Sequence, residues 1–367
     1  MAKQRLKADS RITTHSDLNR FELESKVCNL FCKGKSTTEI LDILANENPP
    51  IVLRRQEPWE IIQRVAKEQH HLSGSLQFVP PVAHTLGRRL ETGRQWLKDR
   101  VEVVHTADVE SIAYRAAGRL LDIMRDSARP DFHVGFAGGG LLEQTARILA
   151  AKLSAAEIDP NLLPRRLYFH AMIGRFGDDP GTDPNSFAAY FTREPLQMEV
   201  RFEGLMCPGM VSAENEAILR DMPGIKESYD KIDSLDVIVT SAGGHWDLGH
   251  SRLHAAYVEK DDKAALTWLK EQGCIGDLMW GPIAKSGAVP LANHTRAMTL
   301  IRLDQLSQLI QQRKKVMLIL GPCVKCGKPK PEILDAVLNW SPPLITHLVV
   351  DSHTVHQLFR DYPTDWA

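Results

Sequence analysis

The sequence VGFAGGGLLEQTA occupies residues 134–146 and passes from an apolar strand pattern to a helical pattern through three consecutive glycines. Backbone amides and the helix dipole converge where such a strand meets such a helix, and this spot attracts negative charge. The pattern therefore predicts a binding site for an anion such as phosphate. It matches neither the GxGxxG dinucleotide fingerprint nor the GxxxxGK[ST] P-loop, so it does not imply a nucleotide. A tight turn without a ligand is the alternative interpretation.

Short apolar runs alternate with helical patterns after residue 108, which predicts an α/β domain with a mostly parallel sheet. In an open sheet of this kind, ligands bind beside the loops at the carboxyl ends of the strands. Several runs end in small residues, among them Gly138, Gly174, Gly243 and Gly321, so we expect the site in these loops. The runs are residues 133–137, 167–173, 200–205, 237–240, 316–320 and 344–350.

Asp277 follows two glycines, Gly273 and Gly276, after a helical pattern at residues 262–272. Aspartate in such a place accepts hydrogen bonds from the hydroxyl groups of a sugar, or it caps a turn. The residues alone leave both roles open.

A basic, cysteine-containing loop follows the apolar run 316–320. Its lysines, with Lys328 and Lys330 among them, can neutralise a phosphate, although an exposed loop would have the same composition. Cys323 and Cys326 form a CxxC pair, but no second pair has the spacing of a zinc ribbon. We therefore assign no metal ligands and expect no cofactor.

The histidines at 245, 250 and 254 lie close together after the Gly243-Gly244 loop. His250 and His254 have i, i+4 spacing, but no HExxH motif accompanies them, so a metal-binding helix is not supported. We expect surface histidines here. The chain also lacks a GxSxG nucleophile motif, and we assign no catalytic residue.

The first 80 residues predict three short helices followed by a strand. The first covers residues 24–33, the second begins at the capping-box pattern of residues 36–39, and the third begins at Pro58. Residues 76–79 have a strand pattern. Three helices and a terminal strand are typical of a winged helix-turn-helix, whose second motif helix enters the major groove of DNA. A small helical dimerisation head is the alternative.

The candidate DNA contacts lie on the third helix and just before it. Arginine and glutamine form paired hydrogen bonds to guanine and adenine edges, whereas lysine more often contacts the phosphate backbone. The connection at residues 46–57 is longer than the usual turn of the motif. The candidate contacts are Arg54, Arg55, Gln56, Gln63, Arg64 and Lys67.

The distribution of charge agrees with a DNA-binding first part. Residues 1–105 carry 17 Lys and Arg against 13 Asp and Glu, whereas the remaining residues carry 28 against 33. The polar N-terminus lacks the apolar core of a signal peptide, and no apolar stretch is long enough to span a membrane. We therefore expect a cytoplasmic protein without membrane contact, whose six cysteines are mostly free thiols.

The order of these elements resembles the SorC family of sugar-binding transcriptional regulators over nearly the whole chain. The body carries the resemblance best, through residues 134–141, 205–209, 236–243, 273–277, 316–321 and 347–352. The resemblance implies a Rossmann-like sensor domain related to sugar-phosphate isomerases and to glucosamine-6-phosphate deaminase. It also implies a homodimer or homotetramer that binds a double-stranded DNA operator under the control of a phosphorylated sugar.

The same resemblance implies roles for particular residues. The amides of Gly138, Gly139, Gly140 and Leu141 would bind the phosphate, with Gln144 nearby. Asp277 would bind hydroxyl groups, and Lys328 or Lys330 would stand where the family has a lysine. Two features depart from the family: glycines replace the hydroxyl residues that commonly follow the first glycine of the phosphate loop, and the cysteine-containing insertion obscures which lysine corresponds.

We therefore expect a winged helix-turn-helix at residues 1–80, a linker helix at 81–104 and an effector domain at 105–367. The combined prediction is a transcriptional regulator whose binding to DNA responds to a phosphorylated sugar. A sugar-phosphate isomerase or deaminase is the alternative, since it would use the same phosphate site. Such an enzyme needs a general base, for which Asp277 and His245 are the candidates, but fold kinship alone does not confer activity.

Overall fold

A computed structural model describes most of the chain. The chain forms two compact units, Met1–Thr85 and Leu86–Ala367, each held together by contacts within the unit. Each unit is treated by itself below. The described residues are 20–32, 35–68, 81–104, 109–127, 129–154, 160–176, 180–193, 196, 198–291 and 293–363.

The first unit contains the three helices that the sequence predicted: α1 (Arg20–Cys32), α2 (Thr37–Ala45) and α3 (Glu57–Glu68). The capping box that begins α2 is present, because the Ser36 hydroxyl accepts from the Glu39 amide at 3.2 Å and the Glu39 carboxylate accepts from the Ser36 amide at 2.9 Å. The predicted strand at residues 76–79 lies outside the described residues. The unit has its own apolar core of Leu23, Val27, Cys28, Ile40, Leu44, Ile51 and Ile61.

The long connection between α2 and α3 is ordered by the same core. The Ile51 amide donates to the carbonyl of Leu44 at 2.9 Å, and the Ile51 side chain is buried. The extra residues therefore return to the core before α3 begins, and the two helices remain packed in one unit.

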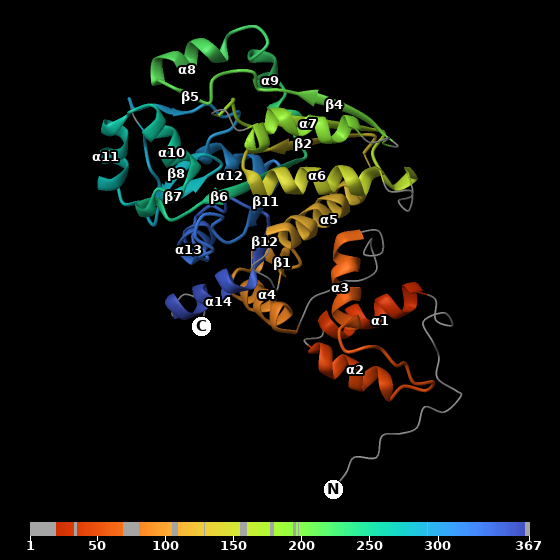
Figure 1. The fold of residues 1–367 in the computed structure, drawn as a ribbon. Coiled ribbons are helices and arrows are strands. Elements are labelled where there is room, and N and C mark those ends of the chain that lie inside the picture. Colours follow the sequence, from red (N-terminus) through yellow and green to blue (C-terminus); the bar gives the residue numbers. More distant parts are fainter. Residues whose placement is uncertain are drawn as a thin grey trace. The chain divides into compact units, whose positions relative to one another are not determined.

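The second unit is built on a parallel sheet with the strand order β1-β12-β11-β6-β2-β3-β4 (Figure 1). All six predicted apolar runs contribute strands to it, which confirms the α/β class and the mostly parallel sheet. The sheet also contains β1, which was not among the predicted runs and which forms one edge. The strands are β1 (Val101–Val104), β2 (Asp131–Phe136), β3 (Arg166–Ala171), β4 (Glu199–Glu203), β6 (Val237–Gly243), β11 (Lys315–Leu320) and β12 (His347–Asp351).

The helices of this unit follow from amphipathic patterns that place apolar side chains against the sheet. Figure 1 shows α5 and α6 lying side by side over it. The helices are α4 (Pro81–Gly93), α5 (Val109–Ser127), α6 (Gly140–Ser154), α7 (Pro184–Arg193), α8 (Ala213–Arg220), α9 (Lys226–Asp230), α10 (Arg252–Glu259), α11 (Lys263–Glu271), α12 (Leu303–Gln311), α13 (Pro331–Leu338) and α14 (Ser352–Asp361).

The strand order changes direction between β2 and β6. From β2 the chain proceeds outward through β3 and β4, and it then returns to the other side of β2 to form β6, β11 and β12. Open α/β sheets bind ligands in the crevice expected at such a switch point, which here is the edge beside the carboxyl ends of β2 and β6. The three glycines of residues 138–140 lie at this point, directly after β2.

The end of β6 also begins a smaller antiparallel layer. β7 (Cys274–Leu278) pairs with β6 by placing Ala242 opposite Leu278 and Gly243 opposite Asp277. β8 (Gly281–Ala284) and β9 (Gly287–Ala288) continue the layer, while β5 (Met210–Val211) and β10 (Arg296–Ala297) form a separate pair. Asp277 therefore belongs to a strand that the sequence pattern did not reveal.

The segment expected to link the two domains contains α4 and then β1. Within α4, Leu86 and Leu90 are buried, and the Arg89 guanidinium lies 4.1 Å from the centre of the Phe359 ring. The Arg94 guanidinium donates to the carbonyl of Leu338 at 2.9 Å. From Leu86 onward this segment is packed into the second unit. Among the described helices, none has the length and apolar character needed to cross a membrane.

Candidate functional site

The glycine corner after β2 is shaped by close contacts on one side. A Cβ atom on Gly138 would lie 2.6 Å from Cδ1 of Ile173 and 2.8 Å from the carbonyl oxygen of Thr182, so only glycine fits. Gly139 has a φ of +125°, a conformation that disfavours other residues. Nothing lies within 4 Å of a Cβ atom placed on Gly140. The corner is therefore closed at Gly138 and open at Gly140.

The amides of this corner differ in whether they already donate a hydrogen bond within the protein. Gly139 donates its amide to the carbonyl of Thr182 at 2.9 Å, which corrects the expectation that this amide is available to a ligand. Gly140 and Leu141 are the first residues of α6, so their amides have no acceptor within the helix. These two amides, at the positive end of the helix dipole, are the ones suited to an anion.

Gln144 lies one turn into α6. Its Oε1 atom is buried and has no hydrogen-bond partner among the described residues. A buried acceptor without a partner is costly, and a bound ligand or water would satisfy it. This side chain was expected near the phosphate, and its oxygen is available to a donor.

The corner after β6 is filled by a carboxyl group. A Cβ atom on Gly243 would lie 2.2 Å from Oδ1 of Asp277, so the carboxyl group occupies the space that the glycine leaves. Ser251 donates its hydroxyl to the same oxygen at 2.5 Å, and the amides of Gly243 and Trp280 also donate to the carboxyl group. Burial raises the pKa of Asp277, while these hydrogen bonds oppose the rise.

The structure separates the two candidate lysines. Lys330 is half-buried, and its ammonium group donates to the carbonyl of Ala242 at 2.9 Å, beside the Gly243-Gly244 corner. Burial lowers the pKa of Lys330, and the nearby groups of Cys323 and Asp277 oppose that change. Lys328 is exposed. Lys330 is therefore the lysine that stands beside the crevice between β2 and β6.

The corners after β2 and β6 lie next to each other. The missing side chain of Gly139 faces Oγ of Ser241, 3.5 Å from where its Cβ atom would be. Amides from α6, a carboxyl group from β7 and an ammonium group from the loop after β11 thus approach one edge of the sheet. Such a set can bind the phosphate and the hydroxyl groups of one small polar molecule.

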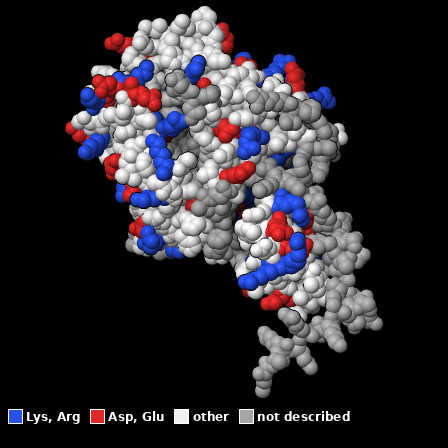
Figure 2. All heavy atoms as spheres, in the orientation of Figure 1, with Lys and Arg blue, Asp and Glu red and all other residues white. Residues whose placement is uncertain are grey.

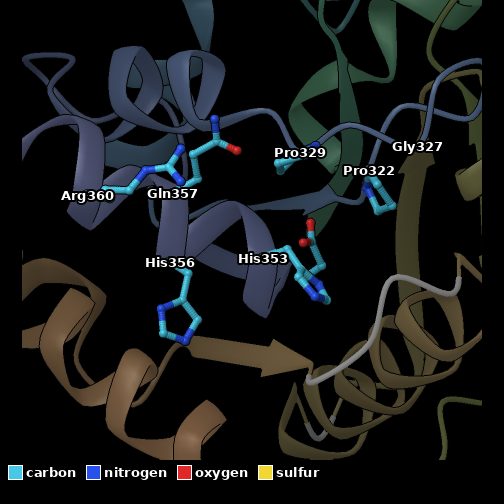
Figure 3. A pocket seen from close by; sticks show the side chains of 8 residues that line it. Pro322, Gly327, Pro329, His353, His356, Gln357 and Arg360 are labelled. Atoms are coloured by element: carbon cyan, nitrogen blue, oxygen red, sulfur yellow. The ribbon is translucent and has the colours of Figure 1, made fainter.

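A pocket of 610 Å³ lies farther along the same edge, at the ends of β11 and β12. None of the predicted ligand contacts lines it. Figure 3 shows Gln357 and Arg360 on one side of the pocket and Pro322 and Gly327 on the other. This pocket was not predicted from the sequence, although α14 carries polar residues at helical spacing directly after β12. Asp351, Pro329, His353 and His356 complete the lining.

In the first unit, the candidate DNA contacts fall into groups with different surroundings. Arg55, Gln56 and Gln63 are exposed, and the exposed Arg54 lies within ion-pair distance of Glu57 and Glu60. The side chain of Lys67 is outside the description. Figure 2 shows blue Lys and Arg atoms interleaved with red Asp and Glu atoms over this unit.

Arg64 differs from the other candidates because it pairs with a buried acid. Its guanidinium donates two hydrogen bonds to Oε1 of Glu24, at 2.9 and 3.1 Å, and only 2% of the Glu24 side chain is exposed. The pair joins α3 to α1. Arg64 therefore stabilises the packing of α3 against α1 in the first unit, whether or not it also contacts DNA.

No protein-family model matches the chain, and no curated protein matches it. Solved structures do. The full-length sorbitol operon regulator SorC from Klebsiella pneumoniae is 16% identical, with a TM-score of 0.53, and the match covers 92% of this chain and 99% of that one. This match extends over the first unit as well as the second.

Two further structures match the body. A DeoR family transcriptional regulator from Listeria monocytogenes is 17% identical, with a TM-score of 0.51 and coverage of 75% of this chain and 99% of that chain. A domain of a possible sugar-binding transcriptional regulator from Arthrobacter aurescens TC1 is 16% identical, with a TM-score of 0.55 and coverage of 76% and 97%. The resemblance inferred from the sequence is thus confirmed as a resemblance of fold.

Proposed function

We propose that this chain is a DNA-binding transcriptional regulator whose affinity for its operator is controlled by a phosphorylated sugar. The observation that carries the proposal is the position of α6 directly after β2 and of Asp277 and Lys330 beside the end of β6, because these two strands border the switch point of the sheet. The match to a full-length operon regulator over 92% of the chain supports the pairing of such a body with a DNA-binding head.

In the proposed complex, the phosphate accepts hydrogen bonds from the amides of Gly140 and Leu141. Lys330 neutralises part of its charge, and Gln144 accepts from a ligand hydroxyl through its unpartnered Oε1. Gly138 shapes the wall, and Asp277 accepts from another hydroxyl while Ser251 holds its carboxyl group. Lys328, which is exposed, contributes at most long-range attraction.

On the DNA side, we propose that α3 and the residues before it contact the operator in the cytoplasm. Arg55, Gln56 and Gln63 are exposed and chemically suited to base edges or phosphates. A homodimer or homotetramer would present paired heads to two half-sites. An effector that favours one arrangement of the bodies would then change the fit of those heads.

The test uses the purified full chain and a fluorescent DNA fragment from upstream of its gene, with a scrambled fragment as control. At physiological salt, anisotropy should report specific binding, and a panel of sugar phosphates should contain a member that changes it. The matching unphosphorylated sugar should have a much weaker effect. Equal affinity for both fragments, or no response to any phosphorylated sugar, would contradict the proposal.

Two variants separate the functions of the two units. Arg55→Ala should weaken DNA binding and leave effector binding intact, because Arg55 lies in the first unit. Lys330→Ala should weaken the effector response and leave DNA binding without effector intact. A variant that lost both activities would have to be checked for folding by circular dichroism before it counted against the assignment.

The enzyme alternative requires a free general base, and the structure favours a binding role for Asp277 instead. Its carboxyl group already accepts hydrogen bonds from Ser251 and from the amides of Gly243 and Trp280. A carboxyl group held in this way is suited to accept from a ligand hydroxyl in a fixed orientation. Turnover of any aldose or amino-sugar phosphate that disappeared in Asp277→Ala would overturn this choice.

A further inference from the structure

Three side chains that can bind metal meet at the ends of two neighbouring strands. His245 follows β6, and Cys323 and Cys326 follow β11, which pairs with β6 in parallel. Their ligand atoms all lie within 4.8 Å of one another. Because the carboxyl ends of adjacent parallel strands share one edge of the sheet, residues 78 or more positions apart come together here.

His245 has an unusual backbone conformation at this cluster. Its φ of 54° lies in the left-handed region that residues other than glycine seldom adopt. Its Nε2 atom is buried and has no hydrogen-bond partner among the described residues. A buried ring nitrogen without a partner is costly, and an ion or a water molecule would satisfy it.

The cysteine pair lies in a turn suited to metal binding. The sulfur of Cys323 accepts hydrogen bonds from the amides of Lys325 and Cys326, and the Gly327 amide donates to the Cys323 carbonyl at 2.7 Å. Gly327 has a φ of +68°, so the turn requires a residue that tolerates this conformation.

A fourth side chain lies next to Cys323, outside the group whose ligand atoms are all within 4.8 Å of one another. Nδ1 of His250 lies 3.5 Å from the sulfur of Cys323. Tetrahedral zinc, with bonds of about 2.3 Å to sulfur and about 2.0 Å to nitrogen, separates two such ligands by about 3.5 Å. The observed separation is therefore close to that of two atoms bound to the same ion.

We propose that His245, Cys323, Cys326 and His250 form a zinc site at this edge of the sheet. Two thiolates and two imidazoles are a ligand set that zinc prefers, whereas magnesium and calcium prefer oxygen ligands. Both cysteines are unpaired in the structure. The sequence contains no second cysteine pair with the spacing of a zinc ribbon, and the proposed partners of this pair are histidines from a distant loop.

The site joins the two loops that border the candidate ligand crevice. His245 directly follows the Gly243-Gly244 corner, and Lys330 lies four residues beyond Cys326. Lys325 adds a hydrogen bond from its ammonium group to the carbonyl of Gly249 at 3.3 Å, which also links the two loops. An ion held between them would fix their separation. Zinc binding itself does not depend on the proposed regulatory function.

The experiment measures metal binding by the full chain without DNA or sugar. Protein purified under a reducing agent and without chelators should contain close to one zinc per chain. After the metal is removed, Zn²⁺ should rebind in competition with a chromophoric chelator. Co²⁺ should give the visible bands of a tetrahedral site and a thiolate-to-metal charge-transfer band in the near ultraviolet.

Matched variants test the ligands individually. Cys326→Ser and His245→Ala should each weaken zinc binding about 100-fold, and His250→Ala about 10-fold. Val324→Ala should leave the affinity unchanged, because Val324 lies in the same loop with 80% of its side chain exposed. Circular dichroism of the metal-free proteins checks that every variant is folded.

Two results would overturn the proposal. One is reduced, folded protein that binds no zinc, or that binds zinc as tightly after Cys326→Ser as before. The other is a Cys323–Cys326 disulfide in freshly purified protein with no uptake of metal after reduction, which would assign the pair to thiol redox chemistry. Unchanged affinity in His250→Ala would remove that residue from the site.

Discussion

Two glycine corners face the crevice at the switch point, and their glycines serve different purposes. After β2, the missing side chain of Gly140 faces open space, with nothing within 4 Å. After β6, the missing side chains of Gly243 and Gly244 face Asp277 at 2.2 Å and Lys330 at 3.2 Å. The first corner leaves room for a ligand, whereas the second makes room for the protein's own polar side chains.

The two corners also differ in electrostatics. The β2 corner presents amides, whose partial charges do not titrate. The β6 corner holds a carboxyl and an ammonium group in a site where burial raises the pKa of Asp277 and lowers that of Lys330. The fixed backbone amides of the β2 corner are suited to bind a phosphate. The charged groups of Asp277 and Lys330 are suited to bind the part of the ligand that determines specificity. The comparison predicts different responses to substitution at the two corners.

The largest effect is expected from Gly243→Ala. The new methyl group would displace the buried Asp277 carboxyl group from its bond with Ser251, and such overpacking should lower the free energy of unfolding by about 2–3 kcal/mol. Urea unfolding followed by circular dichroism measures the change. Gly118→Ala, in α5 with open space around it, is the control and should raise stability by about 0.5–1 kcal/mol. Equal stability of Gly243→Ala and the native protein would show that the β6 corner is not filled as described.

The difference between the corners could not have been predicted from the sequence, although their location could. The positions of β2 and β6 could be predicted from the local periodicity and the glycines, because strand and turn preferences depend on neighbouring residues. What fills a corner depends on long-range contacts. Asp277 reaches Gly243 only because β7 pairs with β6, and β7 is a short strand interrupted by Gly276, so its pattern resembled a loop.

The same limit applies to the candidate zinc ligands and to the head. The capping box of α2 was predictable, since it involves residues three positions apart. The partner of Arg64 was not, because Glu24 lies 40 residues earlier and is buried only once α1 and α3 pack together. Likewise, the sequence could not choose between Lys328 and Lys330, since they differ only in the folded chain, where Lys330 donates to the Ala242 carbonyl and Lys328 is exposed.

A smaller effect is expected from pH, and only through the β6 corner. Lys330 binds phosphate in its charged form, and burial lowers its pKa, so effector affinity should fall about tenfold as alkaline pH removes its proton. The fall should begin below the pH of about 10.4 at which an exposed lysine titrates. The pKa of the free protein governs the onset, because the bound phosphate itself favours the charged lysine. Isothermal titration calorimetry at a series of pH values follows the change.

Lys330→Arg is the matched variant for this measurement. Arginine keeps its charge throughout the accessible pH range, so the alkaline fall in affinity should disappear even if the affinity at neutral pH is altered. A native protein whose effector affinity stayed constant across that range would remove Lys330 from the phosphate site. The phosphate would then be bound by the amides of the β2 corner without a contribution from Lys330.

The smallest effect, and the sharpest separation of binding from folding, is expected from Gly140→Ala. The methyl group enters open space at the first position of α6, so the restricted unfolded chain should make the protein more stable by about 0.5 kcal/mol. If the ligand occupies that space, its affinity should fall about threefold, which is less than 1 kcal/mol. Gly118→Ala should give a similar gain in stability with no change in affinity. A Gly140→Ala protein that bound the effector as tightly as the native chain would place the phosphate elsewhere, since the open corner would then have no occupant to disturb.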